Sequence, residues 1–310
     1  MRSQKTKKKR TWLKVTGIVL LILIIGVGVY AYNVYSSLKT AVTTMHEPTA
    51  VKQSEKRQEP VALTNKDPFS VLMLGVDERA GDRGRSDTMI VLTINPNNNS
   101  VKMLSIPRDT RTEIVGKGKV DKINHAYAFG GVQMSINTVE NFLDIPIDYY
   151  MKVNMEGFRD IVNAVGGITV QNDLDFTYDG YHFTKGQLNL DGKKALAYSR
   201  MRYDDPRGDF GRQTRQRQII QGVIKEGASV SSLANYSDIF NALGKNVKTN
   251  LTFDQMIDIQ KNYKSAGSNI TQMEIKETGT KIGGIYYGLV SDAEKQRVQS
   301  ELKTQLELNK

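Results

Sequence analysis

The hydrophobic pattern of this chain opens with one continuous apolar run at residues 15–32, and no charged residue follows it until Lys39. A run of this length can span a bilayer with help from its flanks. Aromatic residues suited to a membrane interface lie around it: Trp12, Tyr30, Tyr32 and Tyr35. Seven basic residues precede position 15 and no acidic residue precedes Glu47, which predicts a cytoplasmic N-terminus and an extracytoplasmic remainder. The alternative is a cleaved signal peptide with a weak Val29-x-Ala31 cleavage site, and the length of the run favours the uncleaved anchor.

After the apolar run, residues 36–67 are polar and poor in large apolar side chains, with prolines at Pro48 and Pro60. We expect a stem, mobile or partly helical, that holds the folded part off the membrane. The pattern therefore divides the chain into a basic cytoplasmic tail (1–14), a transmembrane anchor (15–35), a stem (36–67) and one folded domain (68–310).

The folded domain mixes short apolar runs with helical spacing. Apolar runs predict strands at 69–76, 89–95, 101–106, 147–153, 168–170, 272–276 and 284–288. Helical spacing predicts helices at 132–143, 158–165, 190–198, 212–226, 253–263 and 292–308, the fifth behind a Thr252/Gln255 capping box. Because helices and strands alternate along the domain, we expect an α/β fold, a three-layer α-β-α sandwich around a central mixed sheet.

The charge of the chain is concentrated at its N-terminus. The formal net charge is +10, with 43 basic and 33 acidic residues. Setting aside the seven basic residues before the anchor leaves 36 against 33, so the high pI reports membrane topology rather than nucleic-acid binding. The absence of cysteine excludes disulfides, a thiolate metal site and a cysteine nucleophile, and a disulfide-free exported protein suits a thick-walled bacterium.

An arginine-rich segment at 200–218 is the strongest chemical signal in the domain. Its six arginines are Arg200, Arg202, Arg207, Arg212, Arg215 and Arg217. Guanidinium groups match phosphate oxygens two at a time, so the segment is suited to a polyanion. Arg212 and Gln216 share a helix face with Ile219 and Val223, which turns Arg212 inward at the first turn of the helix. A buried arginine there is costly unless it binds an anion, and the alternative is a solvated basic face with a few ion pairs.

Three further polar residues lie at strand ends. Asp77 ends the first strand, Asp87 opens the second and Arg108 closes the third. If the second strand is antiparallel to both others, all three lie at one rim of the sheet and could hold Mg²⁺ against a phosphate, with Mn²⁺ suited to the same oxygen ligands. The alternative is that both aspartates cap turns. Arg85, two residues before Asp87, favours the binding site.

Other candidates carry a weaker signal. His125 could be a base, although a lone histidine at a helix start is more often structural. Lys122 and Asn124 could touch a phosphate or cap, and Asp209 could be a helix N-cap or a general base. Because the sequence holds no nucleophile elbow, Walker A loop or H-E-x-x-H motif, catalysis would rely on metal and cation stabilisation of a phosphoryl group attacked by an activated hydroxyl.

Six blocks in order along the domain resemble the signature blocks of the LytR–CpsA–Psr (LCP) family. They are G-V-D-E-R-A-G-D-R-G-R-S-D-T-M, L-S-I-P-R-D-T, D-K-I-N-H-A-Y-A-F-G-G, V-G-G-I-T-V, A-L-A-Y-S-R-M-R and D-P-R-G-D-F-G-R-Q-x-R-Q-R-Q. The similarity covers residues 67–226, and a short cytoplasmic tail with one anchor is also typical of the family. Within the family, the stem, residues 179–181 and the C-terminal region resemble the branch that attaches wall teichoic acid.

The resemblance implies an enzyme that transfers an anionic glycopolymer from an undecaprenyl-pyrophosphate carrier to the muramic acid 6-hydroxyl of peptidoglycan and releases undecaprenyl phosphate. It implies Mg²⁺ held by Asp77 and Asp87, and an apolar tunnel under the sheet for the prenyl chain. The implied pyrophosphate-binding residues are Arg85, Arg108, Arg200, Arg202, Arg212 and Gln216. Asp209 matches an acidic residue that helps to activate the acceptor hydroxyl, which together with Arg108 and Arg212 makes up the implied catalytic set.

Two other functions remain open at this point. A hydrolase would release the polymer to water from the same site, and a non-enzymatic membrane-anchored protein would bind polyprenyl phosphate or wall polymer without turnover. Direct DNA binding is disfavoured because only about fourteen residues lie inside the membrane on this topology. We therefore expect a single-pass protein of a Gram-positive cell membrane, with its catalytic domain outside.

Overall fold

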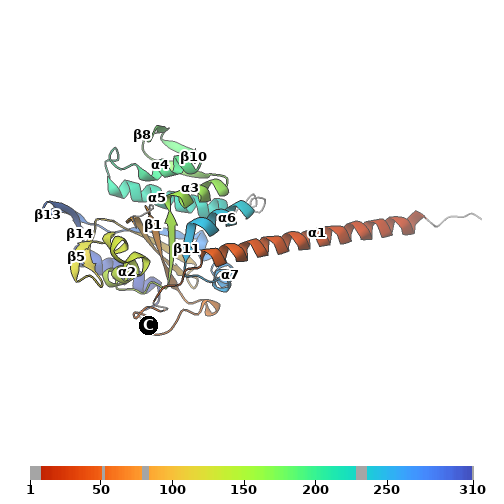
Figure 1. Cartoon of the computed structure of the whole chain (residues 1–310), viewed down its shortest axis with the longest axis horizontal. Coiled ribbons are helices and arrows are strands. Elements are labelled where there is room, and N and C mark those ends of the chain that lie inside the picture. Colours follow the sequence, from red (N-terminus) through yellow and green to blue (C-terminus); the bar gives the residue numbers. More distant parts are fainter. Residues whose placement is uncertain (1–7, 51–52, 79–83, 228–235, 309–310) are drawn as a thin grey trace, which may run out of the picture.

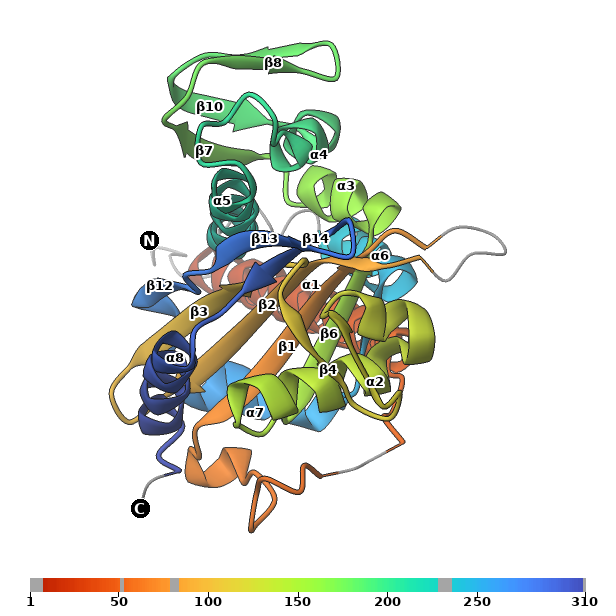
Figure 2. The ribbon, with the colours of Figure 1, turned by 90° about the vertical axis from the view of Figure 1, so that its left-hand side faces the viewer.

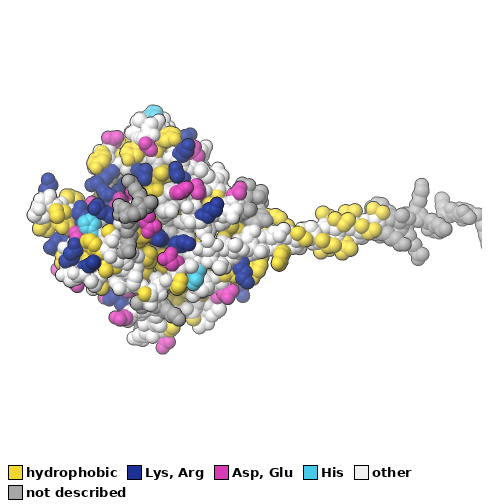
Figure 3. Space-filling model, viewed as in Figure 1, with side chains coloured by type: hydrophobic (Ala, Val, Ile, Leu, Met, Phe, Trp, Pro, Cys, Tyr) yellow, Lys and Arg dark blue, Asp and Glu magenta, His cyan; other side chains and the backbone are white. Residues whose placement is uncertain are grey.

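The computed structural model describes residues 8–50, 53–78, 84–227 and 236–308. One long helix, α1 (Lys8–Met45), projects from the folded domain, and hydrophobic side chains cover its projecting part (Figures 1 and 3). By length and composition, residues Val15–Met45 of this helix could cross a membrane. Its last turns instead pack on the domain, where Ala41, Val42 and Met45 are buried. The helix therefore continues without a break through the first ten residues of the expected stem.

A six-stranded mixed sheet forms the centre of the domain (Figure 2). Its order is β11 (Val247–Thr249), β6 (Tyr149–Asn154), β1 (Phe69–Val76), β2 (Ser86–Asn95), β3 (Ser100–Ile106) and β12 (Ile270–Glu274). β2 is antiparallel to β1 and β3, whereas β6 is parallel to β1 and β12 is parallel to β3. The carboxyl ends of β1, β3, β6 and β12 therefore share one edge of the sheet, which we call the rim.

Alternation along the strands separates the two faces of the sheet. Leu72, Leu74 and Val76 of β1 lie in the same buried cluster as residues of α2 (His125–Leu143) and α8 (Asp292–Gln305). Phe69 and Val71 point to the other face and pack with residues next to α7 (Phe253–Asn262). Successive strand residues face opposite sides of the sheet, so helices pack against both of its faces. This arrangement confirms the predicted layered α/β fold.

Smaller elements complete the domain above the rim and around it. The further helices are α3 (Met155–Ala164), α4 (Gly192–Arg200), α5 (Asp209–Gly227) and α6 (Tyr236–Asn246), with short turns at Leu63–Asn65 and Ala266–Ser268. The two-stranded pairs are β4 (Arg111–Ile114) with β5 (Lys119–Lys122), β7 (Ile168–Asn172) with β10 (Gly186–Leu190), β8 (Phe176–Tyr178) with β9 (Tyr181–Phe183), and β13 (Thr278–Ile282) with β14 (Ile285–Leu289).

Several predicted elements are confirmed and others are displaced. β1 has the predicted bounds, and the Thr252/Gln255 capping box is present at α7. The predicted start of the helix at 190–198 was wrong, because Leu190 ends β10 and the side chain of Asp191 caps α4. α2 begins seven residues before its predicted start, since a kink at Gly130–Gly131 interrupts the helical spacing. The pattern did not predict β4, β5, β8, β9, β10, β11, β13 or α6.

Candidate active site

The rim carries the three strand-end residues that the sequence singled out. Because β2 runs antiparallel to both neighbours, Asp77, Asp87 and Arg108 all lie at this edge, as predicted. Opposite β1, Thr88 pairs with Gly75 and Ser86 pairs with Val76, so Asp87 is the extra residue of a β-bulge. A bulge redirects the side chain of its extra residue, which explains how a strand residue comes to serve a site at the strand end.

A tight loop closure brings Asp77 next to the start of β2. The amide of Asp77 donates to the carbonyl of Arg85 at 3.2 Å. Gly84 has φ +68°, and a Cβ there would lie 2.1 Å from the Asp77 carbonyl oxygen, so this close approach requires glycine. The two aspartates therefore lie on adjacent strands at the same edge of the sheet.

Asp87 is held by two donors from neighbouring segments. Arg108 Nη1 lies 3.1 Å from Asp87 Oδ2, and Asn124 Nδ2 donates to Asp87 Oδ1 at 3.1 Å. Burial disfavours charge on Arg108, but Asp87, Asp109 and Asp209 outweigh it and raise the pKa of the Arg108 guanidinium. Asp109 itself accepts from Lys122 Nζ at 2.6 Å. Positive and negative side chains therefore alternate along the rim and hold one another in position.

The first turn of α5 supplies the second half of the site. Arg212 is only 8% exposed, and its Nη2 lies 2.6 Å from Asp209 Oδ1. Arg202 Nε lies 3.8 Å from the same oxygen, and Gln213 Nε2 donates to Asp209 Oδ2 at 2.8 Å. Burial lowers the pKa of Arg212, with Asp209 opposing that effect. The predicted inward arginine is confirmed, whereas Asp209 is the first residue of α5 rather than its N-cap.

These two halves enclose a narrow pocket, the rim pocket. Its lining consists of Asp87, Thr88, Met89, Ser105, Ile106, Arg108, Asp209, Arg212, Gln213 and Gln216. Within the described ranges, six buried side-chain atoms lack a hydrogen bond, and four of them belong to this lining: Arg108 Nε, Asp209 Oδ1, Arg212 Nε and Gln213 Oε1. A fifth is Oδ1 of Asn124, the residue that donates to Asp87. Asp209 Oδ1 is nevertheless ion-paired with Arg212. A buried donor without an acceptor costs about 1–3 kcal/mol, so the two N–H groups of Arg108 Nε and Arg212 Nε indicate a site that an anionic ligand completes.

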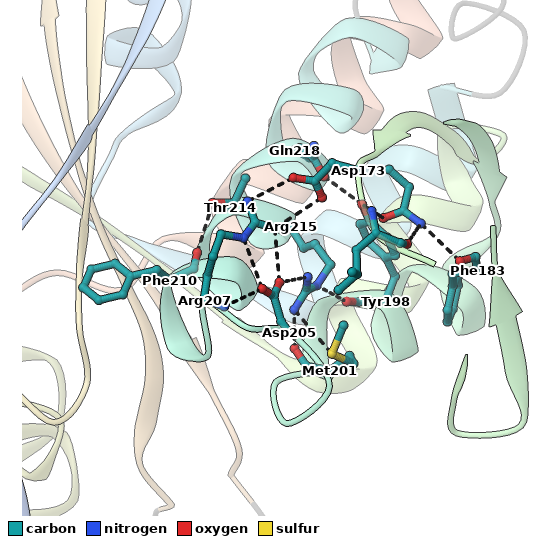
Figure 4. Close-up of polar contacts among 12 residues, drawn as sticks. Asp173, Phe183, Tyr198, Met201, Asp205, Arg207, Phe210, Thr214, Arg215 and Gln218 are labelled. Carbon is teal, nitrogen blue, oxygen red and sulfur yellow. Dashed lines mark hydrogen bonds and ion pairs between the residues drawn. The ribbon is translucent and has the colours of Figure 1, made fainter. Parts of the chain in front are cut away.

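Half of the arginine-rich segment has a structural role instead. Figure 4 shows Arg215 enclosed by Asp205, Tyr198 and Met201. Its guanidinium lies 2.6 Å from Asp205 Oδ2 and donates to the carbonyl oxygens of Met201 and Tyr198 at 2.6 and 3.1 Å. Arg207 also donates to Asp205, at 3.1 Å. Arg215 therefore fastens the 201–208 loop to α5, and Arg207 holds Asp205 from within that loop. Arg212 lines the rim pocket and Arg202 lies next to it.

Arg217 is also buried and does not belong to the pocket lining. It donates to Ser105, Gln272 and Glu274, which lie on β3 and β12, and so attaches α5 to the sheet. Two of the predicted pyrophosphate-binding residues, Arg85 and Arg200, are exposed, and neither belongs to the lining of the rim pocket. Their assignment stays a prediction.

Two neighbouring residues have roles that the sequence left open or missed. At the start of α2, His125 Nδ1 lies 3.1 Å from Asp121 Oδ2 of β5, consistent with the structural role considered for it. Glu277 follows β12, and Thr110 donates to its carboxyl at 3.2 Å. Burial raises the pKa of Glu277 to about 7. No local pattern marked Glu277, because its environment comes from segments far apart in the sequence.

The carboxylates of the rim fit a hard divalent cation only in part. Across the described segments, no group of three or more His, Cys, Asp or Glu is placed to hold a metal ion. Asp77 and Asp87 supply two carboxylates at one edge, and Mg²⁺ is bound by one or two carboxylates together with phosphate oxygens and water. The donor set therefore fits Mg²⁺ that arrives with a phosphate ligand, rather than a site built from protein ligands alone.

Comparison with known proteins gives one consistent result. A model of the LytR_cpsA_psr family matches residues 32–304. The chain is 54% identical over 307 residues, 99% of this chain and all of the other, to the polyisoprenyl-teichoic acid–peptidoglycan teichoic acid transferase TagU of Bacillus subtilis strain 168. The crystal structure of B. subtilis TagU is similar with a TM-score of 0.64 and 56% identity, over 78% of this chain and 97% of that one. A structure of TagT bound to LI-WTA is similar with a TM-score of 0.72 and 32% identity, over 84% of this chain and all of that one.

Proposed function

Because this chain belongs to the LytR_cpsA_psr family, we propose that its rim pocket performs the reaction for which its near full-length relatives are named. In that reaction, teichoic acid passes from a polyisoprenyl carrier to peptidoglycan. The chain is a teichoic acid transferase. The observation that best supports this site is the buried Arg212, whose Nε has no hydrogen bond although it lines a pocket at a helix N-terminus. Helix N-termini and guanidinium groups both favour a phosphate ligand.

The donor that suits this pocket is an undecaprenyl-pyrophosphate-linked polymer. Arg108 and Arg212 line the pocket from two separate segments together with the amide of Gln216. Arg202 lies beside the pocket, with its Nε 3.8 Å from Asp209 Oδ1. Together they carry three positive charges against the negative charges of a pyrophosphate. The arginines are held by Asp87 and Asp209, and because the pocket is too narrow for a pyrophosphate as it stands, these side chains would have to move apart when the donor binds.

Asp77 and Asp87 would hold Mg²⁺ against the same phosphates, and Mn²⁺ would suit the same oxygen ligands. When bound, the cation would withdraw electron density from the phosphoryl oxygens and offset charge that develops on the leaving group. Arg108 and Asn124 both contact Asp87 and hold its carboxylate in position.

The proposed chemistry is a phosphoryl transfer. The muramic acid 6-hydroxyl oxygen forms a bond to the polymer-linked phosphorus, and the bond from that phosphorus to the bridging oxygen breaks. The electron pair leaves with undecaprenyl phosphate, and the hydroxyl proton passes to a base. Arg108 and Arg212, which line the pocket, would stabilise the charge that moves onto the leaving phosphate.

The long apolar helix fits a membrane-anchored enzyme with a lipid-linked donor. We place the basic tail in the cytoplasm and the domain outside, because seven basic residues precede the apolar run and Lys39 alone follows it closely. This orientation would put the rim pocket on the side of the membrane where peptidoglycan lies.

A transfer assay with full-length protein in lipid nanodiscs tests the proposal. A labelled polyprenyl-pyrophosphate glycan, uncrosslinked peptidoglycan and Mg²⁺ are supplied, and label is followed into both products. We expect label in peptidoglycan for the wild type, its loss in Arg212→Ala, and wild-type transfer in the matched control Arg297→Ala. Arg297 is a suitable control because it pairs with Glu294 and Glu301 on the exposed side of α8.

The same assay separates the alternatives. Release of polyprenyl phosphate with no label in peptidoglycan would identify a hydrolase. Tight donor binding without either product would identify a non-enzymatic binding protein, and both results would contradict the proposed transfer.

A further inference from the structure

We infer that Glu277 is the general base that accepts the proton of the acceptor hydroxyl, an inference that rests on the proposed function. Glu277 follows β12, which is parallel to β3, so it lies at the rim alongside Arg108. It immediately precedes the β13–β14 hairpin, which Figure 2 shows at the same end of the sheet as α5. Its position therefore comes from the topology of the sheet and not from its neighbours in sequence.

The backbone around Glu277 is shaped to keep its carboxyl in place. The hydroxyl of Thr110 donates to Glu277 Oε2 at 3.2 Å, and Thr110 forms a β-bridge with Gly288. A Cβ at Gly288 would lie 2.0 Å from Glu277 Oε2, so only glycine leaves room for the carboxyl there. The amide of Gly288 also donates to the carbonyl oxygen of Asp109 at 2.9 Å. The hairpin thus holds the carboxyl against the loop that carries Arg108.

The charged groups that face Glu277 favour the protonated form of its carboxyl. Asp109 and Asp209 are the charged groups that act on its carboxyl, both negative, and Tyr286 of β14 lies close enough to interact with it. Within the described part of the chain no ion pair reaches Glu277. Burial is the main cause that raises the pKa of this carboxyl to about 7, with both aspartates adding to the effect and Thr110 opposing it.

Asp209 is in the opposite situation. Its carboxylate forms ion pairs with Arg212 at 2.6 Å and Arg202 at 3.8 Å, and it accepts a hydrogen bond from Gln213. Both of its carboxylate oxygens are therefore already engaged, one by guanidinium groups and the other by an amide donor. We therefore assign Asp209 to positioning the two arginines, and Glu277 to the proton.

In the proposed step, the Glu277 carboxylate takes the hydroxyl proton as the acceptor oxygen bonds to phosphorus. The bond from phosphorus to the bridging oxygen breaks, and its electron pair leaves with the polyprenyl phosphate. The proton passes from Glu277 to solvent when the product departs. A base whose pKa lies near the working pH gives the best combination of ionisation and proton affinity.

The test compares Glu277→Gln with the wild type, both full-length in nanodiscs, by transfer rate from pH 5 to 9 and by donor affinity. We expect the wild-type rate to fall as the pH decreases below about 7, since the base must be ionised. Glu277→Gln should lose about 10²–10⁴-fold in rate at pH 8 and lose the acid limb of the profile, while its donor affinity stays within twofold. Formate should partly restore the rate of Glu277→Ala, which a structural role would not predict.

Glu140→Gln is the matched control. Burial raises the pKa of Glu140 too, but this glutamate accepts from the Ile147 amide near the start of β6, at the opposite edge of the sheet. It should keep the wild-type rate and acid limb. The inference is overturned if Glu277→Gln retains both, or if it loses donor affinity together with rate. Failure of the wild type to transfer label would overturn the proposed function itself.

Discussion

The Arg215–Asp205 ion pair offers a quantitative test of how the loop before α5 is held. Both side chains are fully enclosed, 1% and 0% exposed, and the charged groups lie 2.6 Å apart. Replacing Arg215 by methionine would leave Asp205 buried, with Arg207 as its remaining cation at 3.1 Å. Breaking one side of a buried pair costs about 3–5 kcal/mol, and the remaining arginine places this case near the lower end.

A loss of about 3 kcal/mol corresponds to a fall in Tm of roughly 6–12 °C for a domain of this size. The assay is thermal unfolding of full-length Arg215→Met in detergent at pH 7, with donor affinity measured below the transition. We expect donor affinity to be unchanged, since neither residue lines the rim pocket. The double variant Asp205→Leu with Arg215→Met should recover much of the stability, because it leaves no buried charge unpaired.

Two results would refute this reasoning. One is a fall in Tm below about 2 °C for Arg215→Met, which would mean that the pair contributes little. The other is a double variant as unstable as the single one, which would mean that the stability is lost through packing rather than through an unpaired charge.

The contribution of the ion pair to stability should also persist at acid pH. Burial alone would raise the pKa of Asp205, but Arg207 and Arg215 lower it to about 2, so its contribution is present above pH 3.8 and is lost as the pH falls through about 2.

Four further outcomes are expected. Gly211→Ala should destabilise the domain by about 1–3 kcal/mol in thermal unfolding, because its Cβ would lie 1.8 Å from Asp205 Oδ2. Arg212→Ala should weaken binding of a polyprenyl-pyrophosphate donor by about 10–100-fold in a direct binding assay, and an unchanged affinity would place the pyrophosphate elsewhere. Removal of Mg²⁺ by EDTA should weaken donor binding in the wild type and have little further effect in Asp87→Ala, as titration calorimetry would show. Because the pKa of Glu277 is raised from 4.5 to about 7, its contribution to stability is present below pH 4.5 and is lost as the pH rises through 7, so Glu277→Gln should raise Tm at pH 8 but not at pH 4.

The rim could be predicted from the sequence because its signals are local. Asp77 and Arg108 follow apolar runs directly, and alternation of strand direction brings their ends together. The bulge at Asp87 could not be predicted in this way, since it depends on how β1 and β2 pair residue by residue. The sequence therefore indicated the right edge of the sheet without indicating what turns the second carboxylate toward it.

The arginine-rich segment shows a second limit. Its spacing predicted one buried face, and Arg212 lies there as expected. Arg215 and Arg217 are also buried, because α5 is covered by α4 on one side and by the β3–β12 part of the sheet on another. Helical spacing identifies one buried face well but gives no sign that a helix is enclosed on several sides. Glu277 had no local signal at all, since its burial comes from the β13–β14 hairpin and the loop after β3.

The central claim is that the rim pocket transfers the polymer-linked phosphoryl group to a hydroxyl of peptidoglycan. The most direct measurement is a single turnover with ¹⁸O in the muramic acid 6-hydroxyl and ³²P in the phosphate next to the polymer, using full-length protein and mass spectrometry of the digested product. The account predicts both labels in one phosphodiester on peptidoglycan, with unlabelled polyprenyl phosphate released. Recovery of ³²P with the lipid would mean that the bond to phosphorus is not the one that forms, and would contradict it.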